Sequence, residues 1–213
     1  RDNQDGSGAS GSYATSIGTW TKASGLASTA VGSRANAGAE SAVAIGASAD
    51  ATGSAAIALG EESAASANAD TAIGRKSKAT GGQSTAIGSG AAASGNLSSA
   101  IGTGATASGI RSLASGSGAS ATAGSATAIG TEAQATATSA TGVGAKAQAT
   151  AISSSAYGYN STASATYATA LGNKATASGT ASTAVGSEAN AGGKYSSAFG
   201  EYSNAAGDAS VAI

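Results

Sequence analysis

Residues 41–54 read SAVAIGASADATGS, and this fourteen-residue pattern returns along almost the whole chain. A period this short and this strict indicates a stack of similar coils with one repeat in each coil, and it argues against an enzyme. The pattern is anchored by a glycine that recurs without insertion or deletion, at Gly18, Gly32, Gly46, Gly60, Gly74, Gly88, Gly102, Gly116, Gly130, Gly144, Gly158, Gly172, Gly186 and Gly200.

Composition alone would indicate a disordered chain. The 213 residues include 33 glycines, one Phe, one Trp and 10% charged residues, and the 41% hydrophobic fraction is largely alanine. Such chains ordinarily bury too little apolar surface to offset the entropy lost on ordering. The strict register argues for order, so we expect a thin, long core instead of a globular one.

The charge balance limits the partners. The net charge is −1, the isoelectric point is near 5.3, and no basic run is present. A chain with this charge balance lacks the basic patch that would bind the phosphates of nucleic acid, and it does not suggest binding to a membrane surface. The absence of cysteine rules out disulfides and fits an exported bacterial chain.

The residues just before each periodic glycine predict a short β-strand. Counting from that glycine, position −3 is mostly β-branched, and −2 and −4 are Ala, Ser or Gly apart from Asp70. Larger side chains two residues apart are typical of a strand. Where −1 shrinks to Ser115, −3 grows to Leu113, so we expect these positions to share one volume. The other −1 residues are all large and apolar: Ile17, Val31, Ile45, Leu59, Ile73, Ile87, Ile101, Ile129, Val143, Tyr157, Leu171, Val185, Phe199 and Ile213.

The second half of each repeat predicts another strand. Position +3 is always Ala, Ser or Thr, +5 is always Ala, and +4 is mostly polar. This strand therefore has a small inward face and a solvated outward face. The variable, often charged residues at +1 and +2 indicate an exposed turn, and a second turn at +8 and +9 closes the coil.

Two short strands per repeat predict an all-β fold, a parallel β-roll (solenoid) of about fifteen 14-residue coils in which equivalent strands pair. A coiled coil also has a period compatible with fourteen, but the larger apolar residues lie two apart, and a helix would contain many interior glycines. A silk-like or disordered spacer is a second alternative. We assign residues 1–10 to an N-terminal leader or cap and residues 11–213 to the roll.

The two faces of the first strand differ in character. We expect −1 and −3 to fill the roll interior, and the uncharged −2 stripe to pack against further copies of the chain. That arrangement predicts that Ala86→Glu or Ala100→Glu blocks assembly. Two alternatives stay open: the small-residue face is simply exposed, or the Ile row faces the oligomer axis and the Ala row the roll interior. The interface candidates are Ala30, Ala44, Ala58, Ala72, Ala86, Ala100, Ala128, Ala170, Ala184 and Ala198.

Two stretches closely match the form Ser-Val-Ala-Ile-Gly-x-x-Ser/Ala, namely Ser41–Ala49 and Asp70–Ser77, and Ser210–Ile213 begins another copy. On these residues the chain resembles the YadA-like head of trimeric autotransporter adhesins over about residues 11–213. The resemblance implies that the β-roll is left-handed and assembles as a homotrimer, so the alanines above become trimer-interface candidates. Most −3 residues are Thr where the family form has Val, a mild departure.

The resemblance also implies a function. It implies attachment of a Gram-negative bacterium to extracellular matrix proteins, host cells or surfaces, with the head outside the cell. Anchoring to the outer membrane would come from a C-terminal domain that this sequence does not contain, and we expect the sequence to be a fragment of a longer protein. The expected partners are two sister chains and matrix proteins or a host cell surface, with no nucleic acid.

The sequence offers little catalytic chemistry. It contains no histidine and no cysteine, and its 11 carboxylates are scattered, so we predict no enzyme activity, no catalytic residues, no cofactor and no metal site. What remains is surface, where exposed aromatic and basic side chains can anchor a partner. The ligand-contact candidates are Trp20, Arg75, Lys76, Lys78, Tyr159 and Tyr202.

Two other functions were weighed against adhesion. An ice-binding or purely structural β-solenoid is the main alternative, but ice binding needs a regular array of outward threonines. The +4 and +6 positions mix Lys, Asn, Gln and Asp with Thr and Ser, which is irregular. A sugar-cleaving β-solenoid would need a carboxylate cluster across neighbouring coils, which the sequence does not predict.

Overall fold

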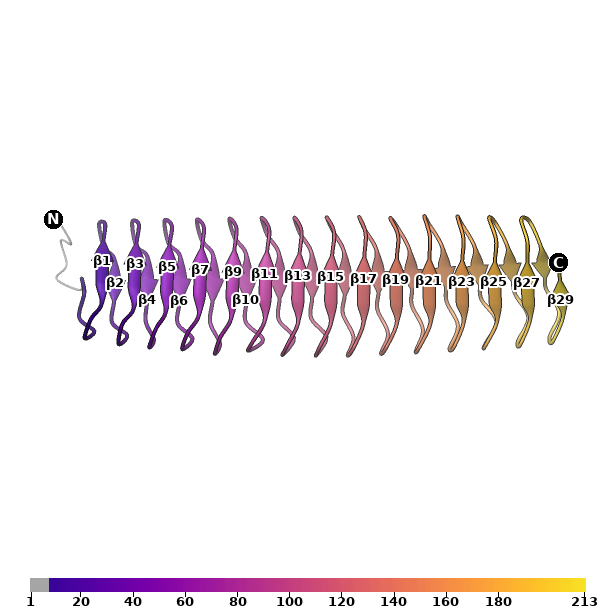
Figure 1. Cartoon of the computed structure of the whole chain (residues 1–213), viewed down its shortest axis with the longest axis horizontal. Coiled ribbons are helices and arrows are strands. Elements are labelled where there is room, and N and C mark those ends of the chain that lie inside the picture. Colours follow the sequence, from indigo (N-terminus) through magenta and orange to yellow (C-terminus); the bar gives the residue numbers. More distant parts are fainter. Residues whose placement is uncertain (1–7) are drawn as a thin grey trace. The chain divides into compact units, whose positions relative to one another are not determined.

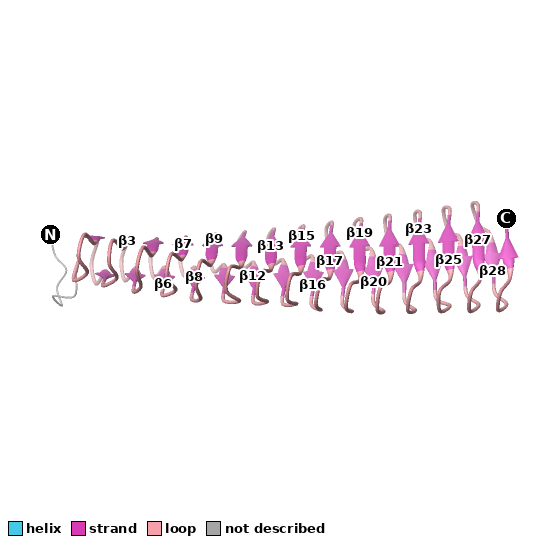
Figure 2. Cartoon of the chain, turned by 60° about the horizontal axis from the view of Figure 1, so that its bottom comes forward, coloured by secondary structure: helices cyan, strands magenta, loops and turns pink. Residues whose placement is uncertain are grey.

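The computed structural model describes residues 8–213, and this part of the chain consists of strands and turns without a helix (Figure 2). It forms two compact units, the first ending at Ser108 and the second spanning residues 109–213. Most of the predicted leader, residues 1–7, lies outside the described residues. Ala9 already forms a parallel bridge with Ala23. The all-β, parallel solenoid predicted from the repeat is confirmed.

In the first unit each coil contributes one strand to each of two parallel sheets (Figure 1). The odd-numbered strands form one sheet: β1 (Thr15–Ile17), β3 (Thr29–Val31), β5 (Val43–Ile45), β7 (Ile57–Leu59), β9 (Thr71–Ile73), β11 (Thr85–Ile87) and β13 (Ser99–Ile101). The even-numbered strands form the other: β2 (Lys22–Ala23), β4 (Asn36–Ala37), β6 (Asp50–Ala51), β8 (Ala64–Ala65), β10 (Lys78–Ala79), β12 (Ala92–Ala93) and β14 (Thr106–Ala107).

The second unit repeats this arrangement. Its odd-numbered strands are β15 (Leu113–Ser115), β17 (Thr127–Ile129), β19 (Thr141–Val143), β21 (Ser155–Tyr157), β23 (Thr169–Leu171), β25 (Thr183–Val185), β27 (Ser197–Phe199) and β29 (Val211–Ala212). Its even-numbered strands are β16 (Ser120–Ala121), β18 (Gln134–Ala135), β20 (Gln148–Ala149), β22 (Thr162–Ala163), β24 (Thr176–Ala177), β26 (Asn190–Ala191) and β28 (Asn204–Ala205).

The pairing register equals the sequence period. Ala44 of β5 pairs with Ala58 of β7, fourteen residues later, and the same offset holds for the other pairs within each unit. Equivalent residues therefore lie side by side in neighbouring coils, and like side chains form columns that run from coil to coil. This is why each position of the repeat keeps its own residue type. The backbone hydrogen bonds go to the residues that flank each partner, as from Thr29 N to Ala42 O at 2.8 Å.

The periodic glycine is required by two local constraints. Gly60, for example, has a φ of 131°, a backbone conformation open essentially to glycine alone. A Cβ added to it would lie 2.6 Å from the carbonyl oxygen of Gly74 in the next coil. Any other residue would both strain the backbone and push neighbouring coils apart.

Each coil turns twice through a left-handed residue that is usually not glycine. Arg34 at +2 has a φ of 58° and Ser41 at +9 has a φ of 56°. The first turn is closed by a 3.2 Å hydrogen bond from Ala35 N to Gly32 O, and the second by an equivalent bond. The turns lie at the two edges of each roll, as predicted, and their side chains point into solvent.

The structure corrects the predicted assignment of the two strand faces. The interior is built from the small residues at −4, −2, +3 and +5, while −1 and −3 point outward. The coil is narrow: the fully buried side chains of residues 8–213 are those of alanine and serine apart from Thr21 and Asp70. The open alternative, with the Ala row inside the roll, is the one the structure adopts.

The ten predicted trimer-interface residues therefore cannot contact a sister chain, and that prediction is wrong. Alternate residues of a strand point to opposite faces, so a −2 side chain shares the interior with the alanines at +5. Each of the ten has 0% exposure within the single chain: Ala30, Ala44, Ala58, Ala72, Ala86, Ala100, Ala128, Ala170, Ala184 and Ala198. Leu113 and Ser115 do share a face, but it is the outer one, where both are half-buried.

Candidate functional surfaces

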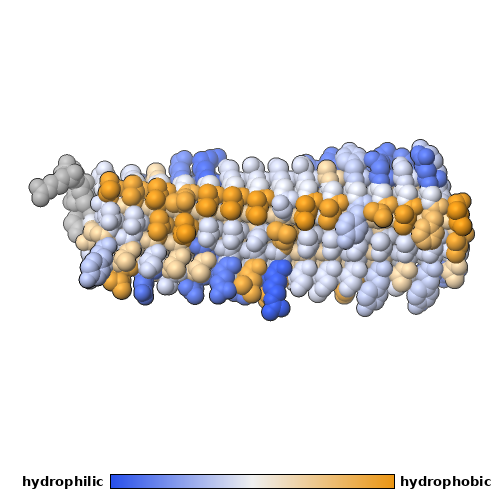
Figure 3. Space-filling model, in the orientation of Figure 1, coloured by the Kyte–Doolittle hydropathy of each residue, from blue (hydrophilic) through white to orange (hydrophobic). Residues whose placement is uncertain are grey.

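Each unit carries a row of large apolar −1 side chains, which lie on the odd-numbered strands or directly after β29 and which we call the apolar stripe. Figure 3 shows orange side chains in a row on this face. Ile87 in the first unit is 37% exposed and Leu171 in the second is 48% exposed. The stripe comprises Ile17, Val31, Ile45, Leu59, Ile73, Ile87 and Ile101 in the first unit, and Ile129, Val143, Tyr157, Leu171, Val185, Phe199 and Ile213 in the second.

The stripe has the properties of a contact surface. Scattered apolar residues are normal on protein surfaces, but contiguous apolar patches mark places where another molecule binds. Here the parallel register aligns one large side chain per coil, for example Ile87 beside Ile73 and Ile101, and only Ser115 interrupts the row among residues 8–213. The sequence pattern predicts these residues in the core, and the structure shows them on the surface.

The predicted basic contact residues lie together on one coil of the first unit. Arg75 and Lys76 occupy the turn that follows β9, Lys78 begins β10, and all three are exposed. Lys76 Nζ lies 3.6 Å from Glu62 Oε2 on the preceding coil, with both side chains about half exposed. An exposed ion pair of this kind contributes little to stability. Because both side chains are about half exposed, they remain accessible to a partner.

The predicted aromatic contact residues are exposed, and each occupies a different turn. Trp20 lies in the turn after β1, four coils before the turn of Arg75, and it is 49% exposed. In the second unit Tyr159 and Tyr202 occupy equivalent turns three coils apart and are also exposed. All of these candidates are exposed in the single chain, and their contact with a ligand stays a prediction.

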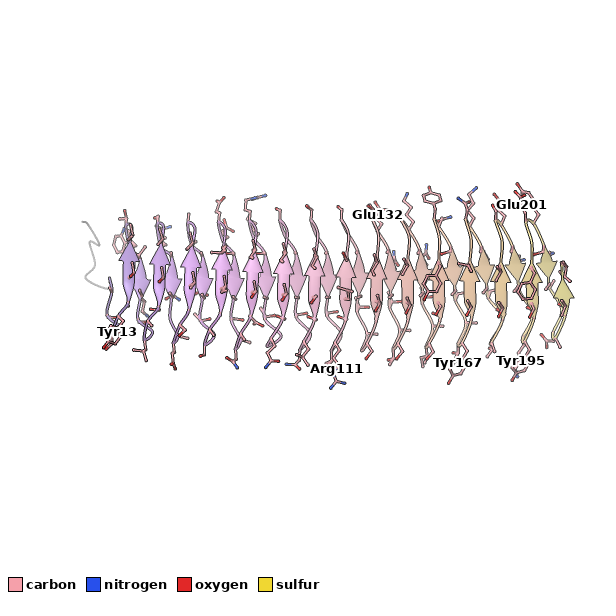
Figure 4. The ribbon with its side chains drawn as sticks, viewed as in Figure 1. Tyr13, Arg111, Glu132, Tyr167, Tyr195 and Glu201 are labelled. Carbon is pink, nitrogen blue, oxygen red and sulfur yellow. The ribbon has the colours of Figure 1, made fainter. Side chains whose placement is uncertain are left out.

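The opposite turn of the second unit holds aromatic residues that the sequence analysis did not single out. Tyr167 and Tyr195 project from the same edge of this unit in Figure 4, and Glu132 and Glu201 lie on its other edge. Lys194 Nζ lies 5.0 Å from the centroid of the Tyr195 ring, a cation–π contact. Both tyrosines occupy position +9, and this shared phase is the signal that could have revealed them.

The outward face of the even-numbered strands is polar. In the first unit Asn36 Nδ2 donates to Asp50 Oδ1 at 2.7 Å, and in the second Asn190 Nδ2 donates to Asn204 Oδ1 at 3.1 Å. These bonds run between equivalent positions of adjacent coils. Over the described residues, this mixture of amides, hydroxyls and charges does not form the uniform threonine array that ice binding needs.

Within residues 8–213, no three side chains among His, Cys, Asp and Glu come close enough together to hold a metal ion. The same part of the chain has no helix with the length and hydropathy to cross a membrane.

Coils of constant length, stacked in parallel with an outward apolar column, define a repetitive parallel β-solenoid. The chain belongs to the YadA head domain family. The model of the YadA head domain repeat (2 copies) matches successive segments that together cover residues 9–91, 93–133, 135–161, 163–189 and 191–213.

Among solved structures, the chain is similar to the crystal structure of the collagen-binding domain of the Yersinia adhesin YadA. The identity is 26% over 77% of this chain and 68% of that chain, with a TM-score of 0.30. No protein of curated function matches the chain.

Proposed function

We propose that this chain is the head of a bacterial surface adhesin that attaches the cell to host matrix proteins, host cells or other surfaces. The observation that carries the proposal is the succession of YadA head repeats from residue 9 to residue 213. The accessible side chains at the turns, Trp20 and the basic residues among them, suit a role in surface recognition. The head would lie outside a Gram-negative cell, anchored to the outer membrane through another part of the protein.

The head is proposed to act as a homotrimer, with the apolar stripe of each chain facing the three-fold axis. The support comes from the exposed column that includes Ile45 and Ile87, since burying such side chains against sister chains removes apolar surface from water. The left-handed sense of the roll, implied by the family resemblance, is part of this proposal.

Adhesion by such a head follows from geometry and not from bond chemistry. A repetitive surface offers many similar contact sites, and a trimer presents each of them three times. Binding of a second and third site is then intramolecular, so the overall avidity exceeds the affinity of one site by a factor on the order of 10² to 10⁴. Individual contacts can stay weak.

The proposal is tested by measuring binding of the purified head to immobilised collagen, fibronectin and laminin, with serum albumin as the negative surface. The wild-type head is expected to bind at least one matrix protein. Ile87→Glu, which places a charge on the apolar stripe, is expected to bind about 100-fold more weakly because avidity is lost. Lys76→Glu is a control for surface charge at a turn. Absence of binding to every matrix protein and to cultured cells would refute the proposed function.

A further inference from the structure

The second unit concentrates its aromatic residues. Five of the six tyrosines of the chain lie between residues 157 and 202. Tyr167 and Tyr195 occupy the same repeat position, two coils apart, and Ala181 occupies that position in the coil between them. Both tyrosines are largely solvent-exposed, at 63% and 60%. Tyr167, Ala181 and Tyr195 form what we call the tyrosine edge, and Figure 4 shows its two rings on one edge of the unit.

The backbone of the tyrosine edge is fixed in place. Tyr167, Ala181 and Tyr195 have φ angles of 61°, 54° and 59°, so the three turns share one conformation. The amide of Ala181 donates to the Thr166 carbonyl at 2.9 Å, and the amide of Tyr195 donates to the Thr180 carbonyl at 2.9 Å. Each turn is therefore hydrogen-bonded to the one before it. The two rings project from a scaffold that does not have to be ordered when a ligand binds.

The spacing of the two rings follows from the stacking of the coils. Neighbouring parallel strands lie about 4.8 Å apart, so positions two coils apart are separated by roughly 9.6 Å. A polyproline II helix has three residues per turn and a rise of about 3.1 Å per residue, so its side chains i and i+3 lie about 9.3 Å apart on one face. Two prolines separated by two residues would thus meet Tyr167 and Tyr195 together, with the intervening turn of the ligand over Ala181.

The chemistry of the edge suits the same ligand. Tyrosine offers a flat apolar ring for a proline ring and a hydroxyl that donates hydrogen bonds, at low cost in side-chain entropy. The exposed Thr180 adds another hydroxyl beside Ala181. A single polyproline II strand has no internal hydrogen bonds, so all of its carbonyl oxygens are free to accept such bonds. Lys194 Nζ lies 5.0 Å from the Tyr195 centroid and Asp208 Oδ1 accepts a 2.9 Å hydrogen bond from Lys194 N, so one charge of each sign lies beside the second ring.

We propose that the tyrosine edge is a binding site for a single proline-rich strand in the polyproline II conformation, with prolines at i and i+3. The inference rests on the proposed adhesive function and assigns one of its contacts. Aromatic residues at fixed spacing recognise proline-rich strands elsewhere because the ligand is already stiff before it binds.

The test uses the full head and a fluorescein-labelled oligoproline of about twelve residues, with binding followed by fluorescence anisotropy. The wild-type head is expected to bind oligoproline and not a Gly-Ser peptide of equal length. Tyr167→Ala and Tyr195→Ala are each expected to raise the Kd at least about tenfold, as loss of an aromatic anchor does. The variant Ala181→Tyr/Tyr195→Ala keeps two rings but places them one coil apart, and it is expected to lose binding as well. Its fold should be intact, because position +9 accepts tyrosine at both neighbouring sites.

Several results would overturn the inference. One is failure of oligoproline to bind the wild-type head; another is full binding by the variant with altered ring spacing. Binding of a triple-helical Gly-Pro-Hyp peptide with no binding of the single strand would assign the edge to a different ligand. A change of oligomeric state in Tyr167→Ala would place the rings in a subunit contact. These failures are distinct from failure of the proposed function, since the head could still attach to matrix proteins in each case.

Discussion

Asp70 accepts hydrogen bonds from both the amide and the hydroxyl of Ser84, which occupies the same repeat position one coil later. The distances to Asp70 Oδ1 are 2.9 Å from Ser84 N and 2.8 Å from Ser84 Oγ, and Gly82 N donates to the same oxygen at 3.0 Å. In other coils the amide at this position donates to a carbonyl of its own turn, as Ser98 N does to Gly95 O. The fully buried carboxylate therefore takes over the closing bond of the next turn.

Asp70→Ala is expected to destabilise the coils around it. The substitution leaves the amides of Gly82, Ser84 and Ala67 without the carboxylate that now accepts their hydrogen bonds. Buried donors without partners cost about 1–3 kcal/mol each, so a local loss of about 2–4 kcal/mol is expected after partial relaxation. Amide hydrogen exchange should accelerate at Gly82 and Ser84. Unchanged exchange at both amides would show that the carboxylate does not hold the turn.

Ser182→Ala is expected to stabilise the roll slightly. Ser182 is buried at the same repeat position as Asp70, and among the described residues its Oγ has no hydrogen-bond partner. Removing an unpaired buried hydroxyl is expected to raise the free energy of unfolding by about 1 kcal/mol. The paired control is Ser28→Ala, which removes a 2.8 Å bond from Ser28 Oγ to Gly25 O and should destabilise. Thermal unfolding of the two variants measures the difference, and equal shifts in Tm would contradict it.

Ala55→Gly is expected to stabilise the protein, although such a change usually has the opposite effect. Ala55 lies in an exposed turn with a φ of 54°, a conformation that costs an alanine about 1 kcal/mol and glycine almost nothing. The net gain is smaller, about 0.5 kcal/mol, because glycine also loses more entropy on folding. The control is Ala51→Gly on β6, where a buried methyl group is lost and stability should fall. A fall in Tm for Ala55→Gly as large as that for Ala51→Gly would be inconsistent with this account.

Two glycine-to-alanine substitutions compare the stability lost at a periodic glycine with the stability lost at a glycine outside that position. Gly60→Ala combines a φ of 131° with a contact of 2.6 Å to the next coil, and it should cost about 3 kcal/mol or more. Gly90→Ala has a φ of 68° and nothing within 4 Å of the added carbon, so a loss of about 1 kcal/mol is expected. Chemical denaturation of the two variants provides the comparison. Similar losses would show that close packing of the coils does not determine the position of the periodic glycine.

The coil architecture could be predicted because the same residue types return every fourteen residues. A glycine such as Gly60 is required in every coil, and parallel stacking aligns residues fourteen apart without any long-range choice. The orientation of the first strand was harder to predict. In most proteins a strand that alternates Ile with Ala buries its Ile side chains and exposes its Ala side chains. In a coil this narrow the usual preference is reversed, and only the small side chains fit inside.

The sequence did contain a signal for the correct faces. Position −1 accepts Tyr157 and Phe199, which could not enter an interior lined by alanines, whereas −2 never exceeds the size of alanine or serine. The role of Asp70 could not be predicted, because its partners come from a turn one coil away. The tyrosine edge follows from sequence phase only after the stacking of the coils is known.

Sedimentation velocity tests most directly the central claim that the apolar stripe meets sister chains while the Ala row fills the roll. The experiment compares the wild-type head with two variants, Ile87→Glu and Ala86→Glu, which change adjacent residues of β11. We expect the wild type to sediment at three times the chain mass of 19.3 kDa and Ile87→Glu as a folded monomer with an unchanged β-sheet circular dichroism spectrum. Ala86→Glu should lose β-structure, since it buries an unpaired charge. A trimeric Ile87→Glu head, or a folded Ala86→Glu monomer, would contradict the claim.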